Sequence, residues 1–217
     1  MAPASGKDLV FRRYVPADGD ELARLFGEVF TRQDPPHVAV GLSADEFAAF
    51  VRIFLPRQET ELLTIVARCA ESGELAGAML NDDLASELPG DYILASPRFA
   101  PIDDMLSQLG EDYLGGRTLV RGRCLHLFLL GVSPRFAQRG VAQRLVVESM
   151  TNAARLGYRV AVVEATNPTS QHIFRKLGFA DRVGRSYGEF THAGDTPFAS
   201  IADQGGMILM EKRLADG

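Results

Sequence analysis

Residues 125–132 constrain the fold of this chain more than any other stretch. They read Leu-His-Leu-Phe-Leu-Leu-Gly-Val, and a nearly continuous apolar run of this length is typical of a central strand covered on both faces. A helical pattern begins near Gln138, only a few residues later, and ends at Leu156 before Gly157. A buried strand that leads directly into a long helix favours an α/β fold.

The start of that helix has no residue that can cap it. Other predicted helices have an acid, a hydroxyl or an amide at the cap position, supplied by Asp18, Ser43 and Asn167. Residues 134–142 instead hold two arginines and a glycine. Free N–H groups at the positive end of a helix bind anions, and small residues let a phosphate approach the backbone. The segment therefore suits a pyrophosphate, with an ordinary strand-to-helix turn as the alternative. Neither the dinucleotide-binding fingerprint nor the P-loop motif is present.

Regular patterns fill the rest of the chain. Further strands are predicted at residues 9–14, 62–69, 75–81, 159–164, 180–190 and 207–212. Further helices are predicted at residues 18–30, 43–55, 102–114 and 167–177. Asp18 with Glu21, and Ser43 with Glu46, form capping boxes for the first two. A proline pair makes residues 31–37 a loop between them.

The order of these elements predicts a single α/β domain over residues 1–217, because no linker or repeat divides the series. The central strands are expected in a mixed sheet with helices on both sides. Residues 82–118 are less regular and are the expected place of an insertion or a lid.

Composition excludes several classes of protein. The 217 residues are 46% hydrophobic and 24% charged, the mix of a soluble globular protein. No apolar run approaches the roughly 20 residues that cross a bilayer, and the N-terminus lacks a signal peptide, so a cytoplasmic location is expected. The net charge of −5 argues against nucleic acid as a partner. Cys69 and Cys124 each stand alone in an apolar run, which predicts two buried thiols and neither a disulfide nor a zinc site.

Two motifs together resemble those of a known family. Residues 132–134 (Val-Ser-Pro) precede residues 138–142 (Gln-Arg-Gly-Val-Ala), and residues 167–179 (Asn-Pro-Thr-Ser-Gln-His-Ile-Phe-Arg-Lys-Leu-Gly-Phe) follow downstream. They resemble the acetyl-CoA loop and the next helix of the GNAT N-acetyltransferase superfamily. The resemblance implies a mixed, mostly antiparallel sheet of about seven strands with helices on both faces. The family usually has Arg or Gln where this chain has Ala137.

A narrower resemblance is to arylalkylamine N-acetyltransferases of the dopamine-acetylating kind. Residues 30–35 (Phe-Thr-Arg-Gln-Asp-Pro) resemble their Phe-x-x-x-Glu-Pro motif, which places Asp34 at the catalytic glutamate, one methylene shorter. Residues 76–81 resemble a stretch on their third strand, and Thr166 and Ser170 match two serines near their active site.

The resemblance also implies which residues hold acetyl-CoA as cosubstrate. The central strand would pair with the pantetheine arm, and the uncapped helix start would bind the pyrophosphate. These residues are Leu130, Gly131, Val132, Gln138, Arg139, Gly140, Val141, Ala142, Asn167, Ser170 and Phe174. No metal is implied.

Acetyl transfer to an amine needs a base more than an acid. For an ammonium with a pKa of about 10.4, presenting the neutral amine at pH 7 costs roughly 4.6 kcal/mol, whereas a thiol leaves as thiolate for about 2 kcal/mol. Asp34 and His126 are the candidate bases, with a turn residue and a core histidine as the alternative interpretations. The usual acid of the superfamily is a tyrosine where this chain has Phe174. Ser170 or Thr166 is therefore the candidate donor, unless either is a plain helix cap.

The expected function is acetyl-CoA-dependent transfer of an acetyl group to the primary amine of a small molecule, such as an arylalkylamine or a polyamine, by direct attack on the bound thioester. In the expected topology Glu164 and Tyr187 are near enough to line the amine pocket, but surface or packing residues are the favoured interpretation of both. The alternatives are a CoA-binding module without transferase activity, suggested by Phe174 and Ala137, and a protein N-acetyltransferase. Neither nucleic acid nor membrane is an expected partner, and the chain is expected to be a monomer or a homodimer.

Overall fold

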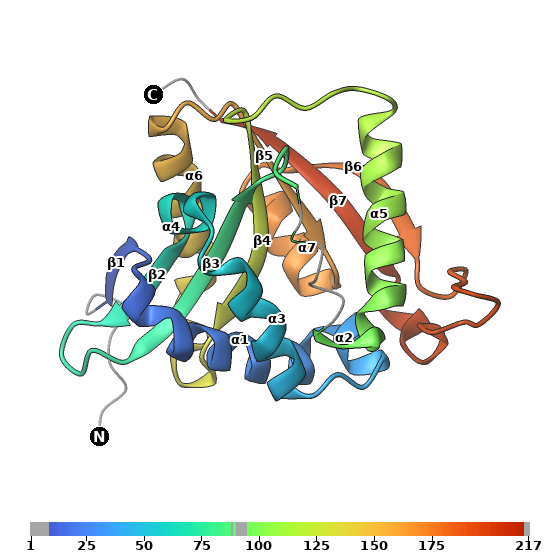
Figure 1. The fold of residues 1–217 in the computed structure, drawn as a ribbon, viewed down its shortest axis with the longest axis horizontal. Helices are drawn as coiled ribbons and strands as arrows, with labels where there is room; N and C mark the ends of the chain where they lie inside the picture. The colour runs from blue at the N-terminus through green and yellow to red at the C-terminus, as the bar shows by residue number, and fades with distance from the viewer. Residues whose placement is uncertain (1–8, 88, 90–94, 215–217) are drawn as a thin grey trace.

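Seven strands form one sheet in the order β1-β2-β3-β4-β5-β7-β6 (Figure 1). The computed structural model describes residues 9–87, 89 and 95–214. Neighbouring strands are antiparallel except β4 and β5, which are parallel, so the predicted mixed, mostly antiparallel sheet is confirmed. The strands are β1 (Leu9–Arg13), β2 (Ile65–Cys69), β3 (Leu75–Asp83), β4 (Cys124–Val132), β5 (Val160–Ala165), β6 (Ala180–Ser186) and β7 (Gly206–Arg213).

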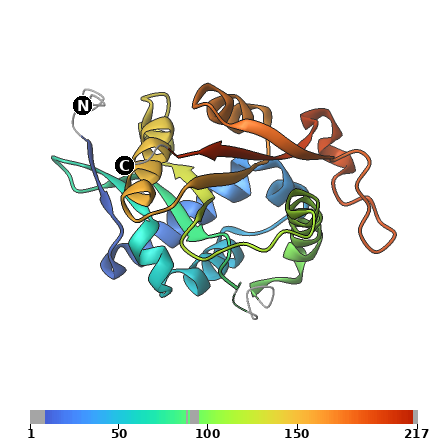
Figure 2. The ribbon, with the colours of Figure 1, turned by 90° about the horizontal axis from the view of Figure 1, so that it is seen from above.

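Helices cover both faces of this sheet, as Figure 2 shows. Helices α1, α3 and α5 lie on one face, and α6 and α7 lie on the other. The α-helices are α1 (Gly19–Gln33), α2 (Pro35–Ala39), α3 (Ala44–Phe54), α4 (Gln58–Leu63), α5 (Ala100–Leu114), α6 (Val141–Arg155) and α7 (Pro168–Lys176). The short helices α2 and α4 were not predicted from the sequence.

Each face of the sheet has its own apolar core, because side chains alternate along a strand. On β3, Ala78 and Leu80 belong to the core shared with α1 and α3, whereas Met79 belongs to the core shared with α6. Phe26 of α1 and Phe47 of α3 are fully buried. Burial of such a ring contributes roughly 1.5–3 kcal/mol, so α1 and α3 are held mainly by their apolar faces.

Strand β4 carries one extra residue. Leu129 pairs with Leu80 and Leu127 pairs with Asn81, which leaves Phe128 without a partner on β3 and makes it a β-bulge. A bulge bends its strand and increases the local twist. The sequence gives no sign of this irregularity, because every residue around it is apolar.

Beyond the first part of β4, the two parallel strands separate. The register of β4 with β5 covers residues 124–126 only, so the edge of β4 that faces β5 is unpaired after His126. Helix α1 packs closely on the far part of β4, where a Cβ on Gly131 would lie 2.9 Å from Cδ1 of Phe26. Glycine at this position lets the helix approach the strand.

The segment at residues 31–37 is helical, which corrects the predicted loop. Helix α1 continues to Gln33, and α2 begins at Pro35 with a second proline behind it. Proline is tolerated in a first helical turn, because the N–H groups there have no partner in the helix. Asp34 is the extended residue between the two helices, with φ −93° and ψ 115°, as a residue before proline prefers.

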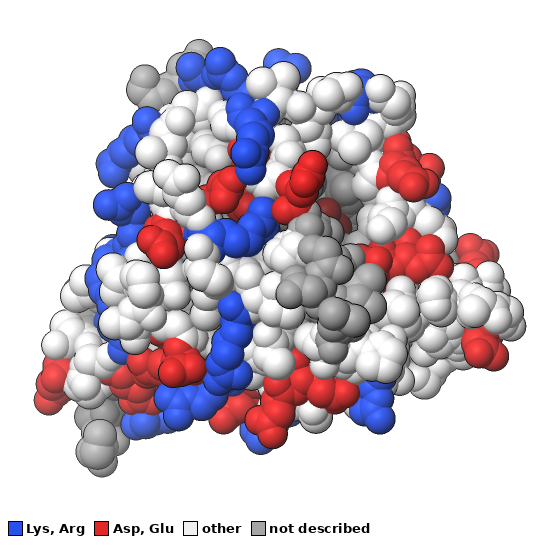
Figure 3. Space-filling model, viewed as in Figure 1, with Lys and Arg blue, Asp and Glu red and all other residues white. Residues whose placement is uncertain are grey.

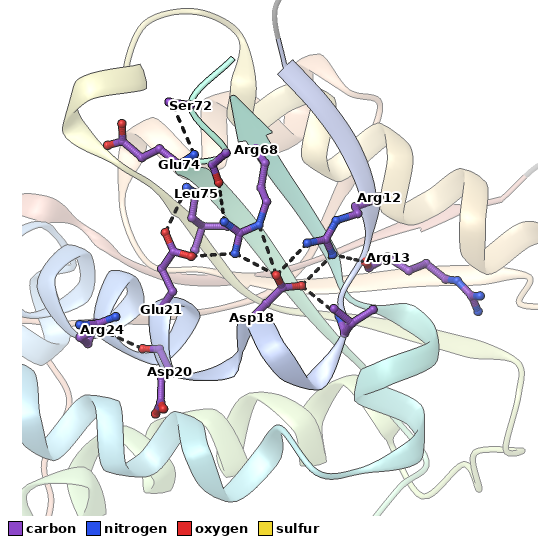
Figure 4. Close-up of polar contacts among 12 residues, drawn as sticks. Arg12, Arg13, Asp18, Asp20, Glu21, Arg24, Arg68, Ser72, Glu74 and Leu75 are labelled. Carbon is purple, nitrogen blue, oxygen red and sulfur yellow. Dashed lines mark hydrogen bonds and ion pairs between the residues drawn. The ribbon is translucent and has the colours of Figure 1, made fainter. Parts of the chain in front are cut away.

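Asp18 binds arginines instead of capping α1 (Figure 4). Its carboxylate accepts hydrogen bonds of 2.7 Å from both Nη atoms of Arg12, and a further bond from Arg68. Glu21 binds Arg68 and the backbone N–H of Leu75. The predicted capping box of Asp18 and Glu21 is therefore wrong, because arginines on β1 and β2 take both carboxylates and join the start of α1 to the sheet.

Other predicted helix ends are confirmed. Ser43 and Glu46 form the capping box of α3. Asn167 caps α7, with Pro168 in its first turn. The predicted helix at residues 102–114 is α5, within the stretch at 82–118 where an insertion or lid is predicted. Residues 88 and 90–94 of that stretch lie outside the described residues.

Both cysteines are buried free thiols, as predicted, and burial raises the pKa of Cys124 to about 12. Within residues 9–87, 89 and 95–214, no helix combines the length and the apolar composition needed to cross a membrane.

Candidate functional site

A cavity of about 340 Å³ passes through the sheet where β4 and β5 separate. Its wall includes Leu129 from the core on the α1 side and Val163 from the core on the α6 side, so it joins the two faces. Much of the wall is aromatic: Phe30, Phe50, Phe54, Phe99, Phe128 and Phe174. The titratable groups on it are Asp34, His37, Asp82, Asp83, Asp103, His126 and Glu164. An apolar chamber with a few polar groups is the usual form of a small-molecule site.

Asp34 accepts hydrogen bonds on both of its carboxylate oxygens. Nδ1 of His37 lies 2.5 Å from Oδ2, and the hydroxyl of Thr166 donates to Oδ1. Only 7% of Asp34 and 8% of His37 are exposed. The hydroxyl of Tyr187 donates to the Thr166 carbonyl over 2.6 Å, and burial, with Asp34 nearby, raises the pKa of Tyr187. The structure thus brings together two predicted catalytic residues, Asp34 and Thr166, and adds a histidine.

A row of three titratable side chains crosses β3, β4 and β5 on the cavity wall. Asp82 is the register partner of His126 on the neighbouring strand. Nε2 of His126 lies 2.7 Å from Oε2 of Glu164. Arg57, which precedes α4, forms an ion pair with Asp82 at the end of the row. Positive and negative groups therefore alternate along it when His126 is protonated.

The electrostatics of the row favour a protonated His126. Burial alone would lower the pKa of His126, but the charges of Glu164 and Asp82 outweigh it and the pKa is raised. Burial opposes ionisation of Glu164, yet His126 keeps the pKa of Glu164 below its ordinary value. Burial raises the pKa of Asp82 in spite of Arg57. Each of the two groups therefore favours the charged form of the other.

The start of α7 forms another part of the wall. Oδ1 of Asn167 accepts from the N–H of Ser170, and the Ser170 hydroxyl donates to the Asn167 carbonyl. Nδ2 of Asn167 lies 3.4 Å from the Thr166 hydroxyl oxygen. Phe174 is buried and packs edge-on against Phe179. Ser170 is thus part of the helix cap, and Phe174 supplies a ring rather than a hydroxyl.

The loop before α6 has open backbone at its end. Gln138 and Gly140 have left-handed backbone, with φ of +61° and +72°, so α6 begins at Val141, three residues later than predicted. No side chain caps this helix, and a Cβ on Gly140 would have no heavy atom within 4 Å. Uncapped N–H groups with a free approach fit the pyrophosphate of acetyl-CoA.

The predicted acetyl-CoA residues fall into two groups. Four of them line the cavity: Leu130, Asn167, Ser170 and Phe174. The others, namely Gly131, Val132, Gln138, Arg139, Gly140, Val141 and Ala142, lie between the end of β4 and the first turn of α6. Because β4 and β5 are parallel, α6 and α7 begin at the same edge of the sheet.

Sequence reasoning missed His37, Asp82 and Arg57. His37 stands three residues after Asp34 at the start of a helix, and this spacing brings side chains together, so a helical interpretation of the proline pair would have found it. Asp82 and Arg57 come from separate elements that only the folded chain brings together. Glu164 lines the cavity, which corrects its favoured interpretation as a surface or packing residue, whereas Tyr187 is fully buried behind Thr166, in keeping with a packing role.

Charge is unevenly distributed over the face in Figure 3. Lys and Arg gather along the left edge, beside β1 and α6, whereas the right-hand part around α5 carries mainly Asp and Glu. The described residues include no group of three or more His, Cys, Asp and Glu side chains placed to hold a metal ion.

Comparison with known proteins places this geometry in a family. Residues 7–179 match the acetyltransferase (GNAT) family. No curated protein matches the chain. Similar solved structures include the C-terminal condensation domain of Ebony in complex with β-alanyl-dopamine, with a TM-score of 0.85, 15% identity, and coverage of 94% of this chain and 98% of that one.

Two further solved structures come from insects. Arylalkylamine N-acetyltransferase 2 from Aedes aegypti has a TM-score of 0.80 and 19% identity, covering 96% of this chain and 100% of that one. Drosophila melanogaster polyamine N-acetyltransferase has a TM-score of 0.76 and 17% identity, covering 95% of this chain and 100% of that one. At these identities the likeness concerns the fold. The family match itself extends from β1 to the residues just after α7, and this chain belongs to the GNAT family of acetyltransferases.

Proposed function

We propose that this protein transfers the acetyl group of acetyl-CoA to the primary amine of a small molecule with an aromatic body. The observation that carries the proposal is the cavity through the sheet. On the α1 side it is lined by phenylalanine rings and carboxylates, and on the other it reaches Leu130 and the start of α7. These two sides suit an amine and a thioester, respectively.

The residues along β4 and α6 would hold acetyl-CoA. The unpaired edge of β4 around Leu130 offers backbone groups to the pantetheine arm, and the N–H groups at Gly140 and Val141 offer a site for the pyrophosphate. Bound there, acetyl-CoA supplies an activated acetyl group and a thiol that leaves readily. Backbone N–H groups on the same edge of β4 would stabilise negative charge on the acetyl oxygen.

The opposite half of the cavity suits an ammonium attached to an aromatic ring. Phe50 and Phe99 are stacked with ring centroids 4.6 Å apart, and Phe128 lies edge-on to Phe50. Aromatic faces attract both aromatic rings and cations. Asp34 and Glu164 supply negative charge for the ammonium. An arylalkylamine can pack its ring against these phenylalanine rings, whereas a linear polyamine has no ring to pack there, so an arylalkylamine fits better.

Helix α5 forms one wall of the cavity and narrows the approach to it. Ile102, Leu106, Ser107 and Gly110, all on α5, line the cavity. A peptide N-terminus would have to pass this helix, which favours a small molecule over a protein as the acetyl acceptor.

A panel of amines tests the proposal. Purified protein is incubated with acetyl-CoA and phenylalkylamines, indolylalkylamines, linear diamines or tripeptides, while free thiol and product mass are followed. We expect amine-dependent thiol release, fastest with the arylalkylamines. Calorimetric titration with CoA runs in parallel. Tight binding without amine-dependent release would indicate a CoA-binding module, and absence of CoA binding would contradict both functions.

A further inference from the structure

We propose that His37 is the proton acceptor for the amine, and that Asp34, Thr166 and Asn167 are positioning residues that fix its tautomer. This inference rests on the proposed amine acetylation and assigns its base. It starts from a chain of hydrogen bonds that runs from the cap of α7 to the imidazole ring.

The cap of α7 fixes which atom donates and which accepts in the first of these hydrogen bonds. The N–H of Ser170 donates to Oδ1 of Asn167 over 2.9 Å, so the amide oxygen faces the helix and Nδ2 faces Thr166, 3.4 Å away. An amide NH₂ only donates. The Thr166 oxygen therefore accepts this bond, and its own proton is directed to Oδ1 of Asp34.

Asp34 passes this direction on to His37. An ionised carboxylate only accepts hydrogen bonds, so the bond of 2.5 Å to Oδ2 requires a proton on Nδ1 of His37. In the neutral ring Nε2 then carries the lone pair. All bonds from the α7 cap to the imidazole agree in direction, and together they select the tautomer in which Nε2 can accept a proton.

The second ring nitrogen of His37 is accessible. His37 lines the cavity, and Nε2 has no hydrogen-bond partner among the described residues. The buried side-chain atoms without a partner in that part of the chain are Thr60 Oγ1 and Asn81 Oδ1, and Nε2 of His37 is not one of them. Nε2 therefore opens on the cavity rather than being sealed in the core.

His37 suits proton transfer better than the other two candidates. Both oxygens of Asp34 are engaged, and a carboxylate is in general a weaker proton acceptor than an imidazole. His126 has the right chemistry, but its Nε2 is engaged by Glu164, which in spite of burial raises the pKa of His126 and so favours a ring that already carries its proton. Asp34 is one methylene shorter than the glutamate of the family that the sequence resembles, and His37, which binds Asp34, lies on the cavity wall beside it.

The surroundings of His37 are mostly uncharged. Phe30 of α1 and Phe47 of α3 pack edge-on against its ring, with centroids 5.4 and 4.9 Å away, and Phe99 lies at 6.1 Å. Its charged contact is Asp34. The 3-10 helix η6 (Ala199–Gln204) also packs on α2, and its Asp203 is exposed. The other titratable groups on the cavity are Asp82, Asp83, Asp103, His126 and Glu164.

The proton balance of the reaction is simple. The ammonium gives one proton to Nε2 of His37, which later releases it to solvent. The neutral amine forms the C–N bond to the acetyl carbon while the C–S bond breaks. The second proton leaves the nitrogen and ends on the thiol of CoA. No oxidant, reductant or metal is needed.

Kinetics of matched histidine variants test the assignment. In the wild type we expect the pH profile of kcat/KM to show one ionisation that is absent from the profile of His37→Gln. His37→Gln should lose 10²- to 10⁴-fold at pH 7, and its residual rate should rise about tenfold per pH unit towards the pKa of the amine. His37→Ala should regain rate with added imidazole. His172→Gln, on the exposed side of α7, serves as control, and thermal unfolding checks that each variant is folded.

NMR provides a readout that does not depend on turnover. In ¹⁵N-labelled wild type we expect the His37 shifts of the Nδ1–H tautomer, and Asp34→Asn or Thr166→Val should change them and lower kcat/KM. If the wild type is active and His37→Gln keeps the same rate and pH profile, the inference is overturned and the proposed function stands. The same holds if NMR shows the Nε2–H tautomer of His37. A wild type inactive towards every amine would overturn both.

Discussion

Nε2 of His126 and Oε2 of Glu164 lie 2.7 Å apart beside the place where β4 and β5 separate. Only 14% and 13% of the two side chains are exposed, so water contributes little to holding either charge. The pair joins the last paired residues of β4 to β5 and forms part of the wall of the cavity. It therefore stabilises the sheet where the sheet itself has stopped pairing.

Glu164→Gln should destabilise the protein most in mildly acidic solution. The folded pKa of His126 is raised, so its contribution is complete below about pH 6.5 and is lost as pH rises through the folded pKa. The folded pKa of Glu164 is lowered, so its contribution is present above about pH 4.3 and is lost as pH falls through the folded value. Urea unfolding should show a loss of about 3 kcal/mol at pH 5.5 and less at pH 9.

The exposed pair His192–Asp104 provides the control for this experiment. Its nitrogen and oxygen lie 2.9 Å apart, with about a third of each side chain exposed, so Asp104→Asn should cost less than about 1 kcal/mol. Equal losses of unfolding free energy in Glu164→Gln and Asp104→Asn would show that burial of the His126–Glu164 pair adds nothing to its contribution to stability. NMR titration should also show a lower pKa of His126 in Glu164→Gln.

Gly140→Ala should weaken CoA binding by about tenfold, or about 1.4 kcal/mol. Its φ of +72° is unfavourable for alanine, and the new methyl group would occupy the free approach to the helix start. Gly194→Ala is the matched control, because Gly194 also has positive φ, +88°, and no heavy atom near its Cβ position. Both variants should lose about 1 kcal/mol of stability. Calorimetry with CoA should separate them, and equal affinities would exclude this helix start as a binding site.

Gly110→Phe should reduce activity towards large amines more than towards small ones. Gly110 lies within α5 on the cavity wall, and a Cβ there would have no heavy atom within 4 Å, so neither packing nor backbone requires glycine. A ring at this position would fill part of the cavity. We expect kcat/KM for arylalkylamines to fall at least tenfold and that for short alkylamines to fall less.

Gly110→Ala separates the space in the cavity from the stability of the helix. Alanine should stabilise α5 by about 0.5–1 kcal/mol and leave the rates nearly unchanged. A loss in the alanine variant as large as in the phenylalanine variant would show that helix mobility, not space, determines the rate.

Asp18→Asn should cost about 2 kcal/mol at pH 7, less than for a fully buried pair because Arg12 is partly exposed. Burial alone would raise the pKa of Asp18, but its bonds from Arg12, the N–H of Val15 and Arg68 lower it. The contribution of the ionised carboxylate is therefore present above about pH 3.9 and is lost as pH falls through the folded pKa. The difference between wild type and variant in urea unfolding should shrink below pH 4. A constant difference would assign the effect to packing.

Local signals explain what the sequence predicted correctly. Ser43 with Glu46, and Asn167 with Pro168, are helix starts whose partners lie within four residues, and all are where they were predicted. The apolar run of β4 was recognisable because burial on both faces leaves no alternation.

Long-range partners explain what the sequence did not reveal. Asp18 has a residue pattern fit for capping, but Arg68 lies 50 residues away and competes for the same carboxylate. His37 was missed because a proline pair can mark either a loop or the first turn of a helix, and a loop was predicted. Asp34 and Thr166, 132 residues apart, were each proposed separately, and only the folded chain shows their hydrogen bond. That residues 82–118 form an insertion or lid stays a prediction.

The bulge at Phe128 has a consequence for how such a site can arise. On β4 the core residue on the α1 side before the bulge is Cys124, and those after it are Leu129 and Gly131. Side chains alternate, so deletion of Phe128 alone would leave all the others on their present faces and restore regular pairing with β3. Insertion or deletion of one codon therefore converts a regular β4 into the bent β4 that lies beside the cavity, or the reverse. A sheet can gain or lose such a bulge while its core residues stay on the same faces.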